Sequence, residues 1–279
     1  MRVDEVLPPS HAARSTTPAE IPRKRRRVQR TDVDAGGTDI NGTDIGAGVD
    51  GDDPCIRTHP PVEATVRVRM GYEAVIFDLG GVVFPSPLAS FDVYDAEAGL
   101  EPGTVRRVVR ESAESGAWAA LERGELSLDA FFGALATEAR ASGVEIDVTR
   151  VFDLIGASST PYPSMVRAVG RIREEGLRVG ALTNNWISPN GTHAPGGPDR
   201  GVTFDVVVES AVEGIRKPEP AIYALALVRL GVGAEATVYL DDLGPNLKPA
   251  RAMGMTTIKV ADPDAALSEL SSVLGLDLG

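Results

Sequence analysis

Short apolar runs, bounded by glycine or polar residues, recur between residues 72 and 260. Runs of this length and β-branched character predict buried strands, which we expect over residues 74–77, 177–182, 204–208, 237–240 and 256–260. Helices are expected in the longer segments between and after them, over residues 164–175, 220–230, 246–253 and 263–274. Strands that alternate with helices predict an α/β fold, with a mostly parallel sheet covered on both faces.

The segment between the first and second of these strands has a different pattern. Residues 85–159 contain no convincing strand, and we expect helices over residues 91–100, 104–115, 117–123 and 127–142. Ser127 is a typical N-cap for the last helix, and Gly143 is a typical residue to end it. Their alanines and large apolar residues favour a small bundle with Trp118 in its core. We therefore expect a helical domain at 89–159, inserted into a sheet domain formed by 71–88 and 160–279.

Residues 1–70 differ from the rest in composition and charge. They are rich in proline, glycine, aspartate, threonine and arginine without a period of 2 or 3.6, which predicts a disordered tail. The basic run at 23–27 is interpreted as solvated charge, with a nuclear-import signal as the alternative. The formal net charge is −12, and residues 1–70 carry 11 basic and 11 acidic residues. The predicted folded part is therefore acidic, which argues against nucleic acid as its main ligand.

Several other classes are disfavoured by what the sequence contains. No apolar run approaches the length of a membrane span, and the one cysteine, Cys55, has no partner for an intrachain disulfide. We accordingly expect a cytoplasmic protein that contacts no membrane. Histidines are few, and only His193 lies beyond the predicted tail, within a Gly/Pro-rich loop at 186–201. A metal site in the core would therefore use mainly oxygen ligands, which favours magnesium-like ions.

Four polar features follow predicted strands and can share one crevice, because ligands of open α/β sheets bind beyond the carboxyl ends of the strands. The features are Asp78, Thr183-Asn184, Lys217 and Asp241-Asp242. Each has an ordinary structural explanation, such as a turn cap, a helix start or a surface lysine. The chain uses only 4 lysines among 28 basic residues, and two prolines stiffen the loop that carries Lys217. Together the four features indicate a functional site.

The chemistry that these residue types suggest is phosphoryl transfer. A carboxylate can attack phosphorus and form an aspartyl phosphate, and two carboxylates from separate strands can hold Mg²⁺. A hydroxyl and an amide can bind phosphoryl oxygens, and a lysine supplies positive charge where negative charge develops. The sequence has no Walker lysine motif, so nucleotide-dependent transfer is not indicated.

The same stretches resemble the four motifs of the haloacid dehalogenase-like hydrolase superfamily. They are residues 77–83 (FDLGGVV), 182–185 (LTNN), 216–218 (RKP) and 239–247 (YLDDLGPNL), and the resemblance covers residues 72 to 276. It is closest to a subgroup that includes the N-terminal phosphatase domain of soluble epoxide hydrolase and the N-terminal domain of acyl-CoA dehydrogenase family member 10. It implies a Rossmann-like core with an inserted α-helical cap that sets substrate choice.

The resemblance also implies a role for each candidate residue. Asp78 would be the nucleophile and a Mg²⁺ ligand, Thr183 and Asn184 would bind phosphate, and Lys217 would be the stabilising cation. The remaining metal ligands would be Asp242, the Gly80 carbonyl and the neighbouring Asp241, with Asn246 orienting the water shell of the metal. The implied activity is hydrolysis of a small phosphorylated metabolite.

One position departs from the familiar phosphatase pattern. The acid/base aspartate expected two residues after the nucleophile is replaced by Gly80. General acid–base help contributes about 10²–10⁴-fold, so its loss should matter. Three outcomes are open: a slow phosphatase whose acid is a cap residue such as Glu122 or Glu125, an enzyme that needs a good leaving group, or an inactive binding domain.

Two further alternatives are less favoured. A dehalogenase with a halide leaving group remains an option, although the sequence looks less like those enzymes. A receiver-like module that only accepts a phosphate also uses Asp, Thr, Lys and paired acids. Receivers carry the acid pair before the phosphorylated aspartate, whereas Asp241-Asp242 follow Asp78 by more than 160 residues. A Mg²⁺-dependent hydrolase is therefore the function we expect, with no prediction of oligomeric state.

Overall fold

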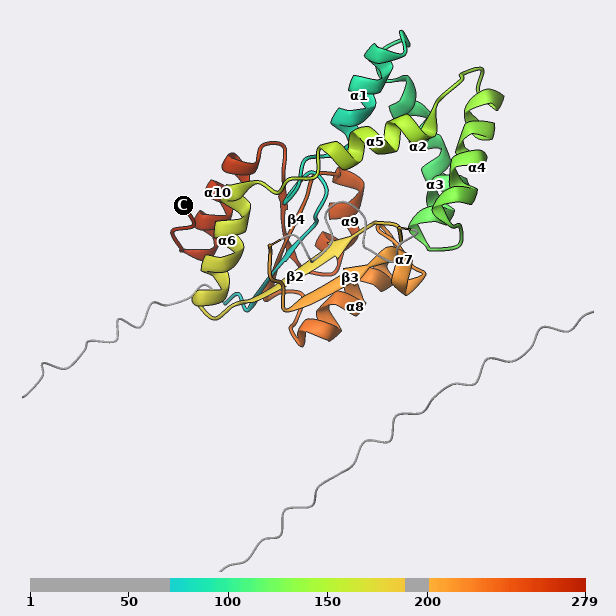
Figure 1. Ribbon diagram of the computed structural model, residues 1–279. Coiled ribbons are helices and arrows are strands. Elements are labelled where there is room, and N and C mark those ends of the chain that lie inside the picture. Colours follow the sequence, from blue (N-terminus) through green and yellow to red (C-terminus); the bar gives the residue numbers. More distant parts are fainter. Residues whose placement is uncertain (1–70, 189–200) are drawn as a thin grey trace, which may run out of the picture. The chain divides into compact units, whose positions relative to one another are not determined.

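The apolar runs predicted as strands form one five-stranded parallel sheet (Figure 1). The computed structural model describes residues 71–188 and 201–279, which belong to one unit of the chain. The predicted tail at 1–70 and most of the predicted loop at 186–201 lie outside these residues. The strands are β1 (Ala74–Phe77), β2 (Arg178–Thr183), β3 (Val206–Glu209), β4 (Thr237–Asp241) and β5 (Thr256–Lys259), in the order β3-β2-β1-β4-β5. The α/β prediction is confirmed.

Helices cover both faces of this sheet, as the alternation predicted. Val75 and Phe77 of β1 face a core formed with α6 (Pro163–Glu174) and α10 (Pro263–Leu274). Ala74 and Ile76 face a second core, formed with α8 (Pro220–Leu230) and α9 (Gly244–Ala252). Because side chains alternate along a strand, a run that is apolar at every position is buried on both sides.

Five helices are inserted between β1 and α6, and we call them the helical insertion (Figure 1). They are α1 (Pro87–Glu97), α2 (Thr104–Ser115), α3 (Ala117–Glu122), α4 (Leu128–Ala141) and α5 (Val148–Ala157). Their apolar side chains form a separate core that includes Trp118, as predicted, and also Trp186 from the loop after β2. The ring centroids of Trp118 and Phe131 lie 5.7 Å apart in a T-shaped contact.

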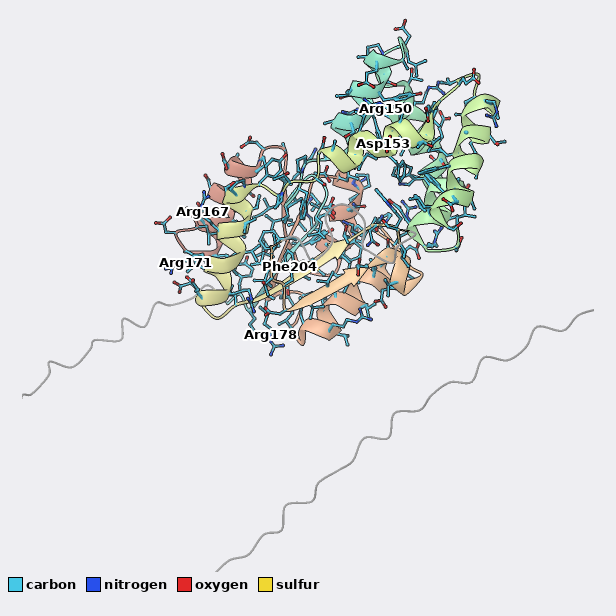
Figure 2. All side chains as sticks on the ribbon, in the orientation of Figure 1. Arg150, Asp153, Arg167, Arg171, Arg178 and Phe204 are labelled. Atoms are coloured by element: carbon cyan, nitrogen blue, oxygen red, sulfur yellow. The ribbon has the colours of Figure 1, made fainter. Side chains whose placement is uncertain are left out.

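Two helices of the insertion differ from the prediction. Helix α1 begins four residues earlier than expected, at Pro87, whose fixed φ suits the first turn of a helix. Helix α5 was not predicted, although Asp147 caps it by accepting a hydrogen bond from Arg150 N. Arg150 also donates two hydrogen bonds, of 3.0 and 2.9 Å, to Glu97 of α1. Figure 2 labels Arg150 and Asp153 on α5.

The strand ends bring the predicted motifs together. Phe77 pairs with Ala181 of β2 and with Leu240 of β4, so residues just beyond these three positions lie along one edge of the sheet. Asp78, Thr183 and Asp241 all lie at or just beyond these ends. Within the described residues, no helix is both long and apolar enough to cross a bilayer.

Candidate active site

Three buried or half-buried carboxylates meet at this edge of the sheet. Asp78 follows β1 directly, Asp241 is the last residue of β4, and Asp242 comes next. One carboxylate oxygen from each lies within 4.8 Å of the others. The aspartates come together because the central strands β1 and β4 are parallel neighbours in register. The structure therefore places three of the predicted site residues in one cluster.

Lys217 reaches the same cluster from the loop between α7 (Ser210–Glu213) and α8. Its Nζ lies 2.8 Å from Asp78 Oδ1 and 2.8 Å from Asp241 Oδ2, and the side chain is 1% exposed. Burial by itself lowers the pKa of Lys217, but the charges of Asp241 and Asp78 outweigh it and hold the pKa above its ordinary value. The lysine is thus a fixed positive charge beside the candidate nucleophile. We call Asp78, Lys217, Asp241 and Asp242 the sheet-edge cluster.

The two adjacent aspartates have different surroundings. Asp241 accepts hydrogen bonds from Leu243 N at 2.8 Å and from Asn246 Nδ2 at 3.1 Å to each oxygen. Its Oδ2 also accepts from Lys217 Nζ and from the hydroxyl of Tyr239. Both oxygens of Asp241 are therefore engaged with protein donors, and its contacts suit the orientation of Lys217 better than the binding of a metal ion.

Asp242 has fewer protein donors and faces the site. Its Oδ2 accepts a hydrogen bond of 3.2 Å from Ser86 Oγ, at the start of the helical insertion. Gly81 approaches Asp242 closely, since a Cβ built on Gly81 would lie 2.1 Å from Asp242 Oδ2. Gly81 also has a φ of +81°, in the left-handed region that favours glycine. Glycine at this position is needed to make room for the Asp242 carboxylate.

The negative charge of the sheet-edge cluster exceeds its positive charge. Burial raises the pKa of Asp78 well above 3.8, with further increases from Asp241 and Asp242 that Lys217 opposes. Burial and the charge of Asp241 raise the pKa of Asp242 to about 6. A divalent cation between the Asp78 and Asp242 carboxylates would relieve this repulsion, and all-oxygen ligands suit Mg²⁺. The residues therefore fit the predicted metal, with Asp78, Asp242 and the Gly80 carbonyl as the candidate ligands.

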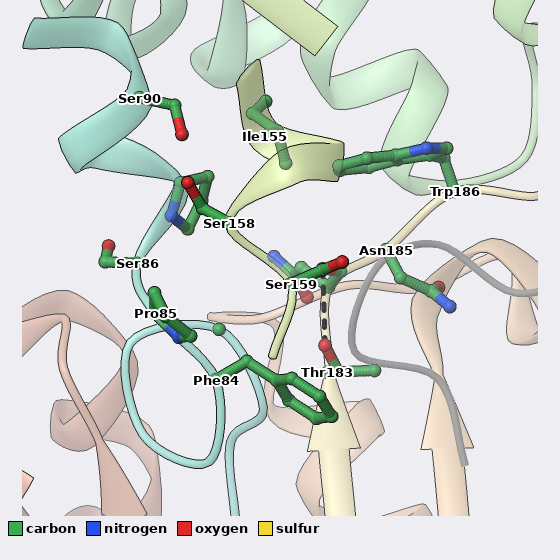
Figure 3. A pocket seen from close by; sticks show the side chains of 13 residues that line it. Phe84, Pro85, Ser86, Ser90, Ile155, Ser158, Ser159, Thr183, Asn185 and Trp186 are labelled. Carbon is green, nitrogen blue, oxygen red and sulfur yellow. Dashed lines mark hydrogen bonds between the residues drawn. The ribbon is translucent and has the colours of Figure 1, made fainter. Parts of the chain in front are cut away.

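Thr183 and Asn184 lie beside the carboxylates but differ in their contacts. Thr183 lines a small cavity of about 60 Å³ together with Gly80, and Figure 3 shows Thr183 next to Ser159 at its lower end. The Asn184 side chain binds the backbone of Lys217, accepting from its N–H at 2.8 Å and donating to its carbonyl at 3.1 Å. This amide positions the Lys217 loop, and a contact of Asn184 with phosphate stays a prediction.

Gly80 borders both this small cavity and a larger one of about 500 Å³. A Cβ on Gly80 would meet only Pro87 Cδ, at an ordinary contact distance of 3.6 Å. The missing acid/base aspartate is therefore not excluded by crowding at the Cβ position.

The larger cavity joins the sheet edge to the helical insertion. Asp78, Lys217 and Asp242 lie at its polar end. Its remaining wall is largely apolar, with contributions from Leu88, Phe91, Val109, Ala113 and Trp118 of the insertion. Glu122 also lines this cavity, whereas Glu125, the other acid considered, is exposed and is not among the lining residues.

Ser86, Tyr239 and Arg216 are site residues that the sequence reasoning did not identify. Ser86 and Tyr239 carry ordinary hydroxyl groups, and only the fold places them against Asp242 and Asp241. Arg216 precedes Lys217, and this adjacency was the one signal that could have identified it. Its Nε lies 2.6 Å from Glu122 Oε2.

Comparisons with known proteins agree with this geometry. Residues 72–254 match the family model for the haloacid dehalogenase-like hydrolases. The chain is 38% identical over 213 residues to mouse (Mus musculus) acyl-CoA dehydrogenase family member 10, covering 74% of this chain and 20% of that protein. It is 32% identical over 222 residues to bifunctional epoxide hydrolase 2 of Sus scrofa, covering 75% of this chain and 40% of that protein.

A shorter relative matches over nearly its whole length. The sesquiterpene phosphatase astK of Aspergillus oryzae (strain ATCC 42149 / RIB 40) is 28% identical over 206 residues, covering 73% of this chain and 97% of that protein. By contrast, the chain spans only a fifth and two fifths of the two larger relatives. The family match covers well over half of the chain and includes all four motifs. The protein therefore belongs to the haloacid dehalogenase-like hydrolase family.

Proposed function

We propose that this protein is a Mg²⁺-dependent phosphatase that hydrolyses phosphomonoesters through an aspartyl phosphate on Asp78. The observation that carries the proposal is the position of Lys217 Nζ, 2.8 Å from Asp78 Oδ1, at the polar end of a 500 Å³ cavity. A buried carboxylate held by a fixed cation is suited to nucleophilic attack on an electron-poor phosphorus.

In the proposed reaction, an oxygen of Asp78 attacks phosphorus and forms a P–O bond while the bond to the ester oxygen breaks. Water then attacks the aspartyl phosphate, which releases phosphate and restores the carboxylate. Lys217 neutralises charge on the nucleophile and on the phosphoryl oxygens, and Asp241 holds Lys217 in place. Thr183 is the proposed hydroxyl donor to the phosphoryl group, because it lies where the two cavities meet.

Mg²⁺, held by Asp78, Asp242 and the Gly80 carbonyl, would supply the positive charge that offsets the phosphate and the carboxylates. Ser86 holds Asp242 from the other side through its hydroxyl group. The raised pKa values of Asp78 and Asp242 support a cation here, because both carboxylates must be ionised to work at neutral pH.

The leaving oxygen must gain a proton, and Gly80 offers no side chain to supply it. We therefore infer a preference for esters whose alcohol leaves readily, or slow turnover of those whose alcohol does not. Gly80 also supports a second candidate function. If turnover is absent while Mg²⁺ and phosphate still bind, the protein is a binding domain built on a hydrolase fold.

The cavity supports a substrate class. Its wall beyond the carboxylates is largely apolar, with side chains from α1, α2 and α3, and Arg106 and Arg110 of α2 also line it. Such a wall suits a phosphate ester with a mainly apolar organic group. The name of the relative described as a sesquiterpene phosphatase is consistent with such a substrate. We propose that the helical insertion is the cap that selects this group.

The test is phosphate release with and without Mg²⁺ from p-nitrophenyl phosphate, farnesyl phosphate and polar sugar phosphates. We expect Mg²⁺-dependent release, with farnesyl phosphate preferred over the sugar phosphates. Asp78→Asn should lose all measurable activity because an amide is a poor nucleophile. Asp153→Asn is the matched control, since Asp153 is exposed on α5 (Figure 2). Activity that survives in Asp78→Asn would exclude Asp78 as the nucleophile.

A further inference from the structure

Glu122, at the end of α3, is a buried carboxylate that the proposed reaction does not use. It is 8% exposed and accepts a hydrogen bond of 3.0 Å from Trp118 Nε1 within the insertion. Its other oxygen faces the sheet domain, where Arg216 Nε lies at 2.6 Å and Asn184 Nδ2 at 3.2 Å. One side chain of the insertion thus holds residues from two separate loops of the sheet domain.

Both of these loop residues are linked to Lys217, Asn184 by hydrogen bonds and Arg216 by the chain itself. Asn184 makes two hydrogen bonds to the backbone of Lys217, one to its N–H and one to its carbonyl. Arg216 is the residue before Lys217, and its Nη1 donates a 2.7 Å hydrogen bond to the carbonyl of Ala113 in α2. Glu122 is therefore linked to the Lys217 loop through two residues, Asn184 and Arg216.

The end of α3 is also packed tightly on the sheet domain. Gly124 has a φ of +69°, and a Cβ there would lie 2.3 Å from the carbonyl oxygen of Ala211. Arg123 Nη2 lies 3.1 Å from Glu219 Oε1, just beyond the Lys217 loop. These contacts fix the position of Glu122 relative to the loop, so its carboxylate can hold Asn184 and Arg216 in place.

We propose that Glu122 is a positioning residue, which holds Lys217 at the nucleophile through Asn184 and Arg216. The packing of the helical insertion against the sheet domain is thereby coupled to the active site. This inference rests on the proposed function. It differs from the role of general acid considered for Glu122, because both carboxylate oxygens accept from donors. Trp118 Nε1 occupies one oxygen, and Arg216 and Asn184 occupy the other, so neither oxygen is left to face the leaving group.

The test compares Glu122→Gln, Arg216→Gln and the double variant, with Glu114→Gln as the control for an exposed glutamate of the insertion. Two substrates are used, p-nitrophenyl phosphate with an easy leaving group and n-hexyl phosphate with a poor one. Displacement of a catalytic group by about 1 Å can cost about 10²-fold. We expect each single variant to lower kcat by about tenfold or more, by the same factor for both substrates, with a smaller change in KM.

The double variant should be no slower than the worse single variant, because both changes break one interaction. Loss confined to n-hexyl phosphate would overturn the proposal and make Glu122 a general acid. A lower Tm with unchanged kcat would also overturn it, since Glu122 would then only stabilise the fold.

A second readout does not depend on turnover. Hydrogen exchange of residues 214–218, measured by mass spectrometry, should be faster in Glu122→Gln than in the native protein and unchanged in Glu114→Gln. Unchanged exchange in Glu122→Gln would contradict the positioning role. If the native protein releases no phosphate, the proposed function fails, and this readout still decides whether Glu122 holds the loop.

Discussion

The sheet-edge cluster and the Glu122 contacts are two buried groups of charge that lie on either side of the Lys217 loop. In the sheet-edge cluster three carboxylates share one cation, Lys217. Glu122, in contrast, faces one guanidinium, that of Arg216, and two neutral donors. The first group has an excess of negative charge that the protein leaves uncompensated, whereas the second is balanced. The difference teaches that uncompensated buried charge suits a ligand, whereas balanced charge suits a contact that holds protein groups in position.

The pKa is raised in both groups, and what differs is the effect of the neighbouring charges. Burial raises the pKa of Glu122, while Arg216 and the indole N–H of Trp118 oppose that rise. For Asp78 the neighbouring carboxylates add to the effect of burial, and its pKa is raised well above the ordinary value. Strongly perturbed carboxylates in a cavity are typical of functional sites.

The largest effect is expected from removing the one cation of the sheet-edge cluster. Lys217→Met should lower the free energy of unfolding by about 3–5 kcal/mol at pH 7, because buried carboxylates lose their partner. Urea unfolding measures this loss. Arg229→Met is the control, since the ion pair of Arg229 with Glu213 is part-exposed and should contribute at most about 1 kcal/mol. Equal losses in the two variants would mean that the buried carboxylates of the sheet-edge cluster do not depend on Lys217 for their stability.

The next effect concerns the missing acid/base. Gly80→Asp should raise kcat for n-hexyl phosphate by about 10²-fold, within the range of general acid–base help, and should change p-nitrophenyl phosphate turnover less. The Cβ has room, and steady-state kinetics with the two esters provide the measurement. If the variant binds Mg²⁺ but turns over neither ester faster, then proton supply is not what limits this site.

The smallest effect is expected on the stability of the metal-free protein. The folded-state pKa of Asp242 is raised to about 6 from 3.8, so stability falls as pH rises from about 4 to about 6. At pH values above 6 in EDTA, Asp242→Asn removes this penalty. The free energy of unfolding should then increase by about 1 kcal/mol, which raises Tm by a few degrees. Below pH 4 the difference should vanish.

The same variant should lose the increase in Tm that Mg²⁺ gives the native protein, because a bound ligand stabilises the folded state. Thermal scans in EDTA and in Mg²⁺ across this pH range measure both effects. A Tm in EDTA that is lower for Asp242→Asn than for the native protein would show that the cluster carries no excess charge.

Much of the fold could be predicted because the signals were local. The run at 74–77 is apolar at every position, and this pattern alone indicates a strand buried on both faces. Helix α5 was missed although Val148, Val151 and Ile155 are buried at helical spacing after the N-cap Asp147. Its pattern is short, and its apolar face is buried by residues distant in sequence, namely other helices of the insertion and Trp186 from the loop after β2.

The four residues of the sheet-edge cluster were predicted from the sequence, but the difference between its two adjacent aspartates was not. Asp241 and Asp242 are neighbours in the sequence, and nothing local distinguishes them. In the structure Asp241 binds Lys217 and Asn246, while Asp242 faces Ser86. The side chain of Asn184, which is predicted to bind phosphate, holds the Lys217 backbone through contacts that span 33 residues of sequence, and nothing local indicated this role.

The sequence by itself determined the alternation of strands and helices and the order of the four motifs, because both depend on residue type and short-range spacing. Only the tertiary structure decided which charges are balanced. Glu122 and Arg216 lie 94 positions apart, and their ion pair exists because the helical insertion is seated on the sheet domain. Burial, which sets the strength of every charge interaction here, is a property of the packed chain and not of any segment within it.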